Sequence, residues 1–292
     1  MNIIRYAAGN EAPKLAVLTD DKRVYPLPQA DFPELIRDAR RENVKASEWI
    51  GKRIAGWTPL DVPGSELALR VPVVAPEVWA AGVTYERSRE ARNYEATGGK
   101  LDATTFYDKV YDAERPELFM KSTAARTVGP NDEMCLRSDS SWQIPEPELG
   151  LVLMGDGEIV GYTVGNDLSC RDIEGENPLY LPQAKVWRKS CAIGPAIRLA
   201  ETVANPYGLD IACRIYRDGE LAVEGRASTG QLKRKLDELV AYLARDNDLF
   251  DGTVLLTGTC IVPPNEFTLA DGDDVEIEIG PIGVLRNRMK QL

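Results

Sequence analysis

The most regular alternation of apolar and polar positions lies in the middle of the chain. Two apolar runs, Leu149–Met154 and Ile159–Val164, flank an Asp-Gly pair at positions 156–157. An Asp-Gly pair in this setting predicts a β-hairpin with a two-residue turn, because both turn positions then adopt positive φ. In that hairpin, Gly155 is expected to pair with Glu158.

The same register brings three carboxylates to one face of the hairpin. Glu148 falls opposite Gly165, and Glu146 falls opposite Asp167. Because side chains alternate between the two faces of a strand, all three acids share a face. Two structures fit this pattern: a solvated acidic surface, or a cleft in which protons or a cation neutralise the charges. A register slip of one residue would move Asp167 to the opposite face.

The remaining pattern predicts a strand-rich chain with few helices. Helices are expected near Asp31–Glu42, in the charged segment Tyr85–Glu95, and at Thr229–Asn247, which carries one apolar stripe. A second Asp-Gly pair at 218–219 predicts another hairpin. The expected strands are Asn2–Tyr6, Lys14–Leu18, Val78–Val83, Glu117–Lys121, Ile211–Arg217, Glu220–Glu224, Thr253–Leu256, Asp271–Ile279 and Ile282–Asn287.

The chain of 292 residues is long enough for one large domain or two unequal ones. A segment rich in proline and glycine at 57–64 suggests a boundary. We therefore expect a small N-terminal α/β cap domain at 1–70, without evident chemistry, and a catalytic domain at 71–292.

Composition narrows the class of partners. The net charge of −11 argues against a nucleic acid or an anionic membrane as partner. No apolar run is long enough to span a bilayer, and the first residues lack the layout of a signal peptide. Five scattered cysteines without a Cys-x-x-Cys pair indicate reduced thiols in a cytoplasmic protein. The chain has no histidine, so an acidic metal site would be all oxygen and would suit Mg²⁺, with Mn²⁺ or Ca²⁺ as alternatives.

Four short motifs resemble the fumarylacetoacetate hydrolase family over about residues 75–292. They are Pro-Glu-Pro-Glu-Leu at 145–149, Gly-Tyr-Thr-Val-Gly-Asn-Asp-Leu-Ser-Cys-Arg-Asp at 161–172, Gln-Ala-Lys at 183–185 and Cys-Ala-Ile-Gly-Pro at 191–195. The resemblance implies an α+β, strand-rich fold of the mixed β-sandwich or roll type, preceded by a small N-terminal domain. It also implies a homodimer or homotetramer.

The family's functional residues can be carried over by position. The resemblance implies a metal, usually Mg²⁺, held by Glu146, Glu148 and Asp167. It implies catalytic roles for Lys185 and Glu117, either of which could be the base. The substrate-binding residues implied in the same way are Thr259, Lys121, Ser88 and Arg171.

One departure from the family pattern affects the predicted reaction. The family's hydrolases carry a His-Glu dyad in a lid segment, and counting from Tyr85 places Ser88 and Ala91 at those positions. Without histidine, a His general base and a Ser-His-Asp triad are excluded. The chain is therefore more similar to the branch that dehydrates 2-keto-3-deoxy-pentonates to a 2,5-dioxo acid, with a 2-oxo acid as substrate. The alternatives are an acylpyruvate or fumarylpyruvate C–C hydrolase, a 2-oxo acid decarboxylase, and an inactive ligand-binding relative.

Overall fold

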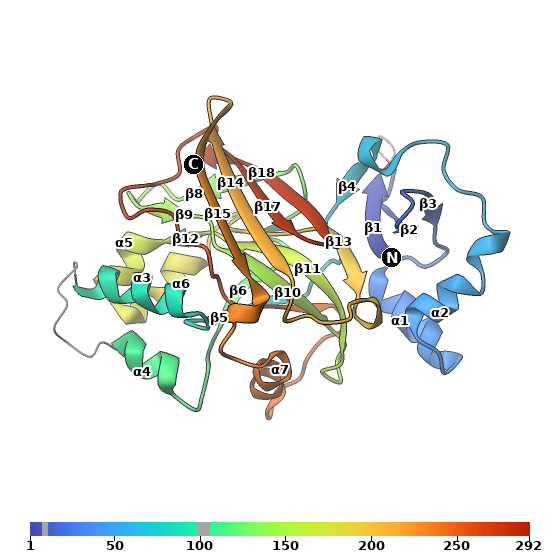
Figure 1. The fold of residues 1–292 in the computed structure, drawn as a ribbon, viewed down its shortest axis with the longest axis horizontal. Helices are drawn as coiled ribbons and strands as arrows, with labels where there is room; N and C mark the ends of the chain where they lie inside the picture. Colours follow the sequence, from blue (N-terminus) through green and yellow to red (C-terminus); the bar gives the residue numbers. More distant parts are fainter. Residues whose placement is uncertain (8–10, 98–105) are drawn as a thin grey trace.

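The computed structural model describes residues 1–7, 11–97 and 106–292, and it contains two sheets that pack face to face (Figure 1). The larger, mixed sheet has the spatial order β3 (Val24–Pro26), β2 (Lys14–Leu18), β1 (Asn2–Ala7), β13 (Cys191–Leu199), β11 (Ile159–Asp167), β10 (Pro147–Leu153), β16 (Thr253–Leu256), β5 (Glu77–Gly82) and β6 (Glu117–Thr123), with β4 (Ala68–Arg70) beside β1 and β7 (Thr127–Val128) beside β13. The second has the order β15 (Glu220–Ser228), β14 (Asp210–Arg217), β17 (Asp274–Ile279), β18 (Gly283–Gln291) and β8 (Glu133–Leu136). The predicted strand-rich α+β fold is confirmed.

Short helices cover the two ends of the molecule. α1 (Phe32–Arg41) and α2 (Ala46–Gly51) accompany the N-terminal strands. At the opposite end lie α3 (Glu86–Thr97), α4 (Phe106–Asp112), α5 (Arg171–Glu176) and α6 (Leu181–Lys185), together with the small pair β9 (Gln143–Ile144) and β12 (Ser169–Cys170). α7 (Leu236–Ala244) packs below the sheets in Figure 1. Short 3₁₀ turns occupy Ile54–Gly56, Gly64–Glu66, Pro178–Tyr180, Ala200–Thr202 and Thr229–Gln231.

The N-terminal segment forms its elements as predicted. α1 begins after Asp31, whose side chain accepts a hydrogen bond from the Glu34 backbone N–H at 2.8 Å, as an N-cap does. Its strands join the larger sheet, because Asn2 of β1 pairs with Arg198 of β13. The domain boundary near residue 70 therefore stays a prediction, since the two parts of the chain share one sheet.

The central hairpin has the predicted register at its far end but a different turn. Glu148 pairs with Gly165, as expected. At the turn, however, the Met154 backbone N–H donates to the Glu158 carbonyl at 3.1 Å, so the loop has three residues, 155–157. Of the Asp-Gly pair, only Gly157 has a positive φ (82°). The expected pairing of Gly155 with Glu158 is wrong. A bulge near Leu153 absorbs the one-residue offset and restores the predicted register.

Two further expectations can be compared with the structure. The second hairpin, β14–β15, turns at Asp218 and Gly219, both with positive φ (52° and 83°), as the type I′ signal requires. The helix expected over Thr229–Asn247 is shorter. A 3₁₀ turn capped by Ser228 comes first. α7 begins only after Lys235, whose backbone N–H donates a hydrogen bond to the Glu238 side chain. This capping sets the start of the helix, and the apolar stripe of α7 still packs into the core.

The core lies around β10 and β11, which are buried along almost their whole length. Apolar side chains from both sheets and α7 cover them. Acidic side chains at the ends of these two strands are therefore removed from water. Among the described residues, no helix is long and apolar enough to cross a membrane.

Candidate active site

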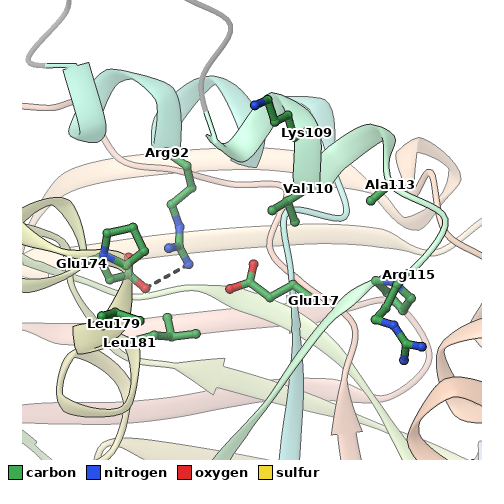
Figure 2. A pocket seen from close by; sticks show the side chains of 11 residues that line it. Arg92, Lys109, Val110, Ala113, Arg115, Glu117, Glu174, Leu179 and Leu181 are labelled. Carbon is green, nitrogen blue, oxygen red and sulfur yellow. Dashed lines mark ion pairs between the residues drawn. The ribbon is translucent and has the colours of Figure 1, made fainter.

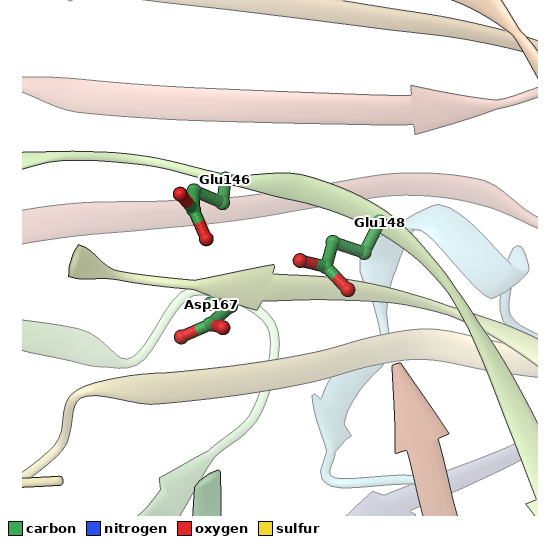
Figure 3. A group of neighbouring side chains, drawn as sticks. All are labelled: Glu146, Glu148 and Asp167. Carbon is green, nitrogen blue, oxygen red and sulfur yellow. The ribbon is translucent and has the colours of Figure 1, made fainter. Parts of the chain in front are cut away.

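Three carboxylates converge at the end of the central hairpin. Glu146 immediately precedes β10, Glu148 lies within β10, and Asp167 ends β11; the three residues are 4%, 1% and 1% exposed. One oxygen of each lies within 4.8 Å of the others, and Figure 3 shows the side chains pointing toward a common space. The backbone N–H of Asp167 donates to the Glu146 carbonyl at 3.0 Å, which keeps the two residues opposite each other. The alternative of a solvated acidic face is wrong.

Two buried lysines contact the acidic cluster from different elements. Lys185, the last residue of α6, places its Nζ 2.6 Å from Glu146 Oε2 and 3.4 Å from Asp167 Oδ2, and it donates to Ser169 Oγ at 2.5 Å. Lys121 places its Nζ 2.7 Å from Asp167 Oδ1. Lys121 is the extra residue of a bulge in β6, which turns its side chain inward.

A second set of charged side chains surrounds this cluster. Arg171 donates from Nη2 to Glu146 Oε1 at 2.9 Å. Glu174, one turn later on α5, lies 3.2 Å from Lys185 Nζ and 2.9 Å from Nη2 of Arg92. Arg92 belongs to α3, so a chain of buried ion pairs joins α3 to the acidic cluster. An Arg171–Glu174 pair was foreseeable from its i,i+3 spacing, whereas no sequence signal marked Arg92.

The cationic side chains around the cluster act unequally on the pKa values of Glu146 and Glu148. Burial raises the pKa of Glu146, but Lys185 and Arg171 outweigh it and lower that pKa to about 2. Burial, together with the charges of Asp167 and Glu146, raises the pKa of Glu148 well above its usual value. The backbone N–H of Gly258 donates to Glu148 Oε2 at 2.6 Å, which offsets this only in part. Additional positive charge beside Glu148 would therefore stabilise its ionised form.

This donor set fits a hard divalent cation. It offers three carboxylate oxygens from a buried, sulfur-free and histidine-free site, which is the ligand chemistry that Mg²⁺, Mn²⁺ and Ca²⁺ prefer. Because the ionised form of Glu148 is the one that its surroundings disfavour, this carboxyl gains most from a bound cation.

The surroundings of Lys185 favour its protonated, ammonium form. A metal ion alone would, by its like charge, lower the pKa of a neighbouring lysine. Burial lowers the pKa of Lys185, but the carboxylates of Asp167, Glu146 and Glu174 outweigh it and raise that pKa above its ordinary value. The surroundings given by the protein alone therefore favour a proton donor at this position.

Glu117 projects into a cavity of about 500 Å³ next to the cluster (Figure 2). Arg92 and Glu174 line the same cavity, so its wall reaches Lys185 through Glu174. Apolar side chains form much of the remainder, among them Val110, Leu179 and Leu181.

The Glu117 carboxylate has an unusual environment. Its Oε2 is buried and has no hydrogen-bond partner within the described part of the chain. Burial raises the pKa of this group, partly opposed by Arg92. Gly82 faces Glu117 across the β5–β6 ladder, and a Cβ at this glycine would lie 2.0 Å from Glu117 Oε2. The carboxylate therefore occupies space that only a glycine leaves open.

The other predicted substrate-binding residues, Thr259, Ser88 and Lys121, are all buried. Thr259 is buried, and its hydroxyl donates to the Ile261 carbonyl at 3.1 Å within its own loop. Ser88 is buried on the first turn of α3, and Ala91 is buried one turn further on. Lys121 also donates to the backbone carbonyls of Leu168 and Lys185. These contacts tie Asp167 to the backbone at Leu168 and Lys185 through the Lys121 ammonium group.

The comparison with known families agrees with this site. The family described as fumarylacetoacetate (FAA) hydrolase C-terminal matches residues 88–290. The chain belongs to this family. The match contains all three carboxylates, both lysines, Glu117 and Thr259.

Among curated proteins, the chain is similar to two dehydratases. It is 47% identical over 227 residues to 2-dehydro-3-deoxy-D-arabinonate dehydratase of Saccharolobus solfataricus, covering 78% of this chain and 76% of that one. It is 51% identical over 217 residues to the probable 2-keto-3-deoxyxylonate dehydratase of Haloferax volcanii, covering 74% and 73%.

The solved structures include a similar protein with bound ligands. 2-Keto-3-deoxy-D-arabinonate dehydratase complexed with magnesium and 2,5-dioxopentanoate superimposes with a TM-score of 0.85 at 36% identity, covering 100% of this chain and 99% of that one. The apo form of such a dehydratase gives a TM-score of 0.86 at 36% identity, with the same coverage.

Proposed function

We propose that this protein is a Mg²⁺-dependent dehydratase that converts a 2-keto-3-deoxy-pentonate to 2,5-dioxopentanoate (2-oxoglutarate semialdehyde) in sugar-acid breakdown. The observation that carries the proposal is the buried set of three carboxylates, joined through Lys185 and Glu174 to the cavity that holds Glu117. The similarity to a dehydratase complexed with magnesium and 2,5-dioxopentanoate supports it.

Glu146, Glu148 and Asp167 would hold the metal ion in this proposal. When bound, Mg²⁺ supplies Lewis acidity, which lowers the energy of an enolate formed from a 2-oxo acid. Arg171 and Lys121 would keep Glu146 and Asp167 in place through their 2.9 Å and 2.7 Å contacts. Such supporting contacts orient ligand carboxylates and tune their charge.

Glu117 and Lys185 take different roles in the proposed reaction. The Glu117 oxygen has no hydrogen-bond partner in the described residues and lines the cavity, so it is free to accept the C3 proton of the substrate. Lys185 already donates to Glu146 and Ser169, which suits an acid rather than a base. Lys185 would supply the proton with which the C4 hydroxyl leaves as water. Loss of water leaves a C3–C4 double bond beside the C5 alcohol. Transfer of a proton from C5 to C3 then gives the C4–C5 enol, which tautomerises to an aldehyde at C5; the C2 ketone is retained, so the product is the 2,5-dioxo acid.

The alternative hydrolase reaction needs a catalytic base that this protein lacks. Hydrolysis of an acylpyruvate requires a base that delivers water to a ketone carbon, and the lid positions that carry this base in the hydrolases are Ser88 and Ala91 here. Neither side chain can act as that base. For abstraction of a C3 proton from the metal-bound substrate, the base required is Glu117, which is present.

A substrate panel tests the proposal. The purified protein is incubated with the D and L enantiomers of 2-keto-3-deoxy-pentonate, which differ only at C4, and with an acylpyruvate, after chelation and again after Mg²⁺ is restored. We expect 2,5-dioxopentanoate from at least one pentonate, only with Mg²⁺, and no cleavage of the acylpyruvate. Rapid acylpyruvate cleavage with the deoxy sugar acids untouched would refute the dehydratase assignment.

We further propose a cytoplasmic location and a homodimeric or homotetrameric assembly. All five cysteines are free and buried, which suits a reducing compartment. Light scattering of the purified protein measures the assembly directly.

A further inference from the structure

A strained turn joins β5 to α3 beside the candidate active site. Val83 has a φ of +52°, a conformation that β-branched residues rarely adopt. This turn directs the next two residues into the protein, where Thr84 and Tyr85 are each 1% exposed. Strain of this kind persists where the surrounding structure fixes it, and it is frequent at functional sites.

The turn is locked against the loop that supports Glu148. Thr84 Oγ1 donates to the Thr257 carbonyl at 2.7 Å. Gly258 has a φ of +98°, and a Cβ there would lie 1.9 Å from Thr84 Oγ1. The Gly258 backbone N–H holds Glu148, and Thr259 follows directly. The turn at 83–85 and the loop at 257–260 therefore form one packed unit at the acidic cluster.

Tyr85 presents a buried hydroxyl with no hydrogen-bond partner in the described part of the chain. A buried hydroxyl without a partner is unfavourable, and native structures contain few of them. Tyr85 lies beside the cluster because the preceding residue, Thr84, bonds to the loop whose Gly258 N–H holds Glu148. The Tyr85 ring and Cys260 also line a second cavity of about 570 Å³, with Arg87 and Arg226 among its other residues.

We propose that Tyr85 is a further substrate-binding residue, whose phenol O–H donates a hydrogen bond to the carboxylate of the 2-oxo acid held beside Thr259. This inference rests on the proposed function. Burial raises the pKa of Tyr85, so the phenol keeps its proton and acts as a donor at neutral pH. A neutral donor adds no charge to the cluster, and a bound carboxylate gives the buried hydroxyl its missing partner.

The variant Tyr85→Phe tests this role, since it removes the hydroxyl and keeps the ring. A hydrogen bond to a charged group predicts a rise in KM of about 10- to 100-fold. A contact made equally in ground and transition states should leave kcat nearly unchanged. The thermal stability of the free protein should not fall, because the hydroxyl makes no hydrogen bond there. The matched control is Tyr162→Phe, a buried core tyrosine on β11, which should keep the wild-type KM.

An unchanged KM in Tyr85→Phe would overturn the inference, as would a loss of stability with KM intact. If the variant folds poorly, its Mg²⁺-loaded folded fraction is assayed for pyruvate binding by calorimetry. Wild-type protein should bind pyruvate more tightly than the neutral pyruvamide, and this preference should be several-fold smaller in the variant, which keeps only the share due to the metal ion. This binding assay does not depend on dehydration. It therefore distinguishes a failed role for Tyr85 from a failed assignment of the reaction.

Discussion

Glu148→Gln should remove metal binding without weakening the metal-free fold. The substitution keeps the size of the side chain and removes a charge that nothing in its surroundings fully compensates. One oxygen from each of the three carboxylates lies within 4.8 Å of the others. At that separation, two like charges repel by about 3 kcal/mol at an effective dielectric constant of about 20. Glu148 faces both Asp167 and Glu146, so its ionisation in the metal-free protein opposes folding.

The sign of the pH dependence follows from the direction of the pKa shift. Burial and the two neighbouring acids raise the pKa of Glu148 in the folded protein. The folded state therefore binds more protons than the unfolded state above the ordinary glutamate pKa, and Glu148 lowers stability as pH rises through this window. The loss is at most about 1.4 kcal/mol per pH unit for one group. In Glu148→Gln this contribution should disappear, so the chelated variant should match the wild type near pH 4 and exceed its stability at alkaline pH.

Denaturant unfolding with and without Mg²⁺ measures both effects. At a Mg²⁺ concentration of 100 times Kd, the wild type should gain about 2.7 kcal/mol, whereas the variant should gain little. Glu158→Gln is the control, because Glu158 lies on the same hairpin but is exposed and pairs with Arg40 and Lys45. Its effect should stay within about 1 kcal/mol and should not depend on Mg²⁺. Full Mg²⁺ stabilisation of Glu148→Gln, or a large loss of its metal-free stability, would refute the reasoning.

Three further results are expected. Glu117→Gln should lower the rate of dehydration at least about 100-fold while keeping the stabilisation by Mg²⁺. Because burial raises the pKa of Glu117, wild-type kcat/KM should rise with pH through a value above the ordinary glutamate pKa. Equal activity of the variant and the wild type would exclude Glu117 as the base. Gly82→Ala should displace the Glu117 carboxylate and lower kcat, whereas Gly280→Ala, at a position with open space, should not; unaltered kcat in both would contradict the proposed crowding. Calorimetry should show that pyruvate increases Mg²⁺ affinity in the wild type; independent binding would argue against a shared site.

The register of the central hairpin was predictable because its pattern is strong over many residues. The predicted turn was nevertheless wrong by one position. The Asp-Gly pair favoured a two-residue turn, whereas the structure has a three-residue loop and a compensating bulge. The one-residue offset at the turn and the one-residue bulge cancel, so Glu148 lies opposite Gly165 as predicted. The alternation of apolar and polar residues specifies which face of the strand a residue occupies. It does not reveal a longer turn and a bulge that compensate each other.

Other parts of the site had no signal in the pattern of residues. Arg92 and Glu174 meet because α3 and α5 pack together, and neither position differs in type from an ordinary surface charge. The left-handed φ of Val83 contradicts the local preference of a β-branched residue, so only tertiary contacts explain it. Lys121 reaches Asp167 through a bulge, which shifts its side chain away from the face that simple alternation predicts.

The charge distribution explains why the metal and an anionic substrate should favour each other. Glu146 and Asp167 already have cationic partners, Lys185, Arg171 and Lys121, within 2.6–2.9 Å. Glu148 is the carboxyl whose ionised form its surroundings disfavour, so a divalent cation beside it balances that charge and retains one positive charge. A single substrate carboxylate balances that remaining charge. In a protein of net charge −11, a monoanion gains little from the global field and depends on this local balance. Each ligand therefore removes the electrostatic penalty of binding the other, and linkage requires the effect to be reciprocal.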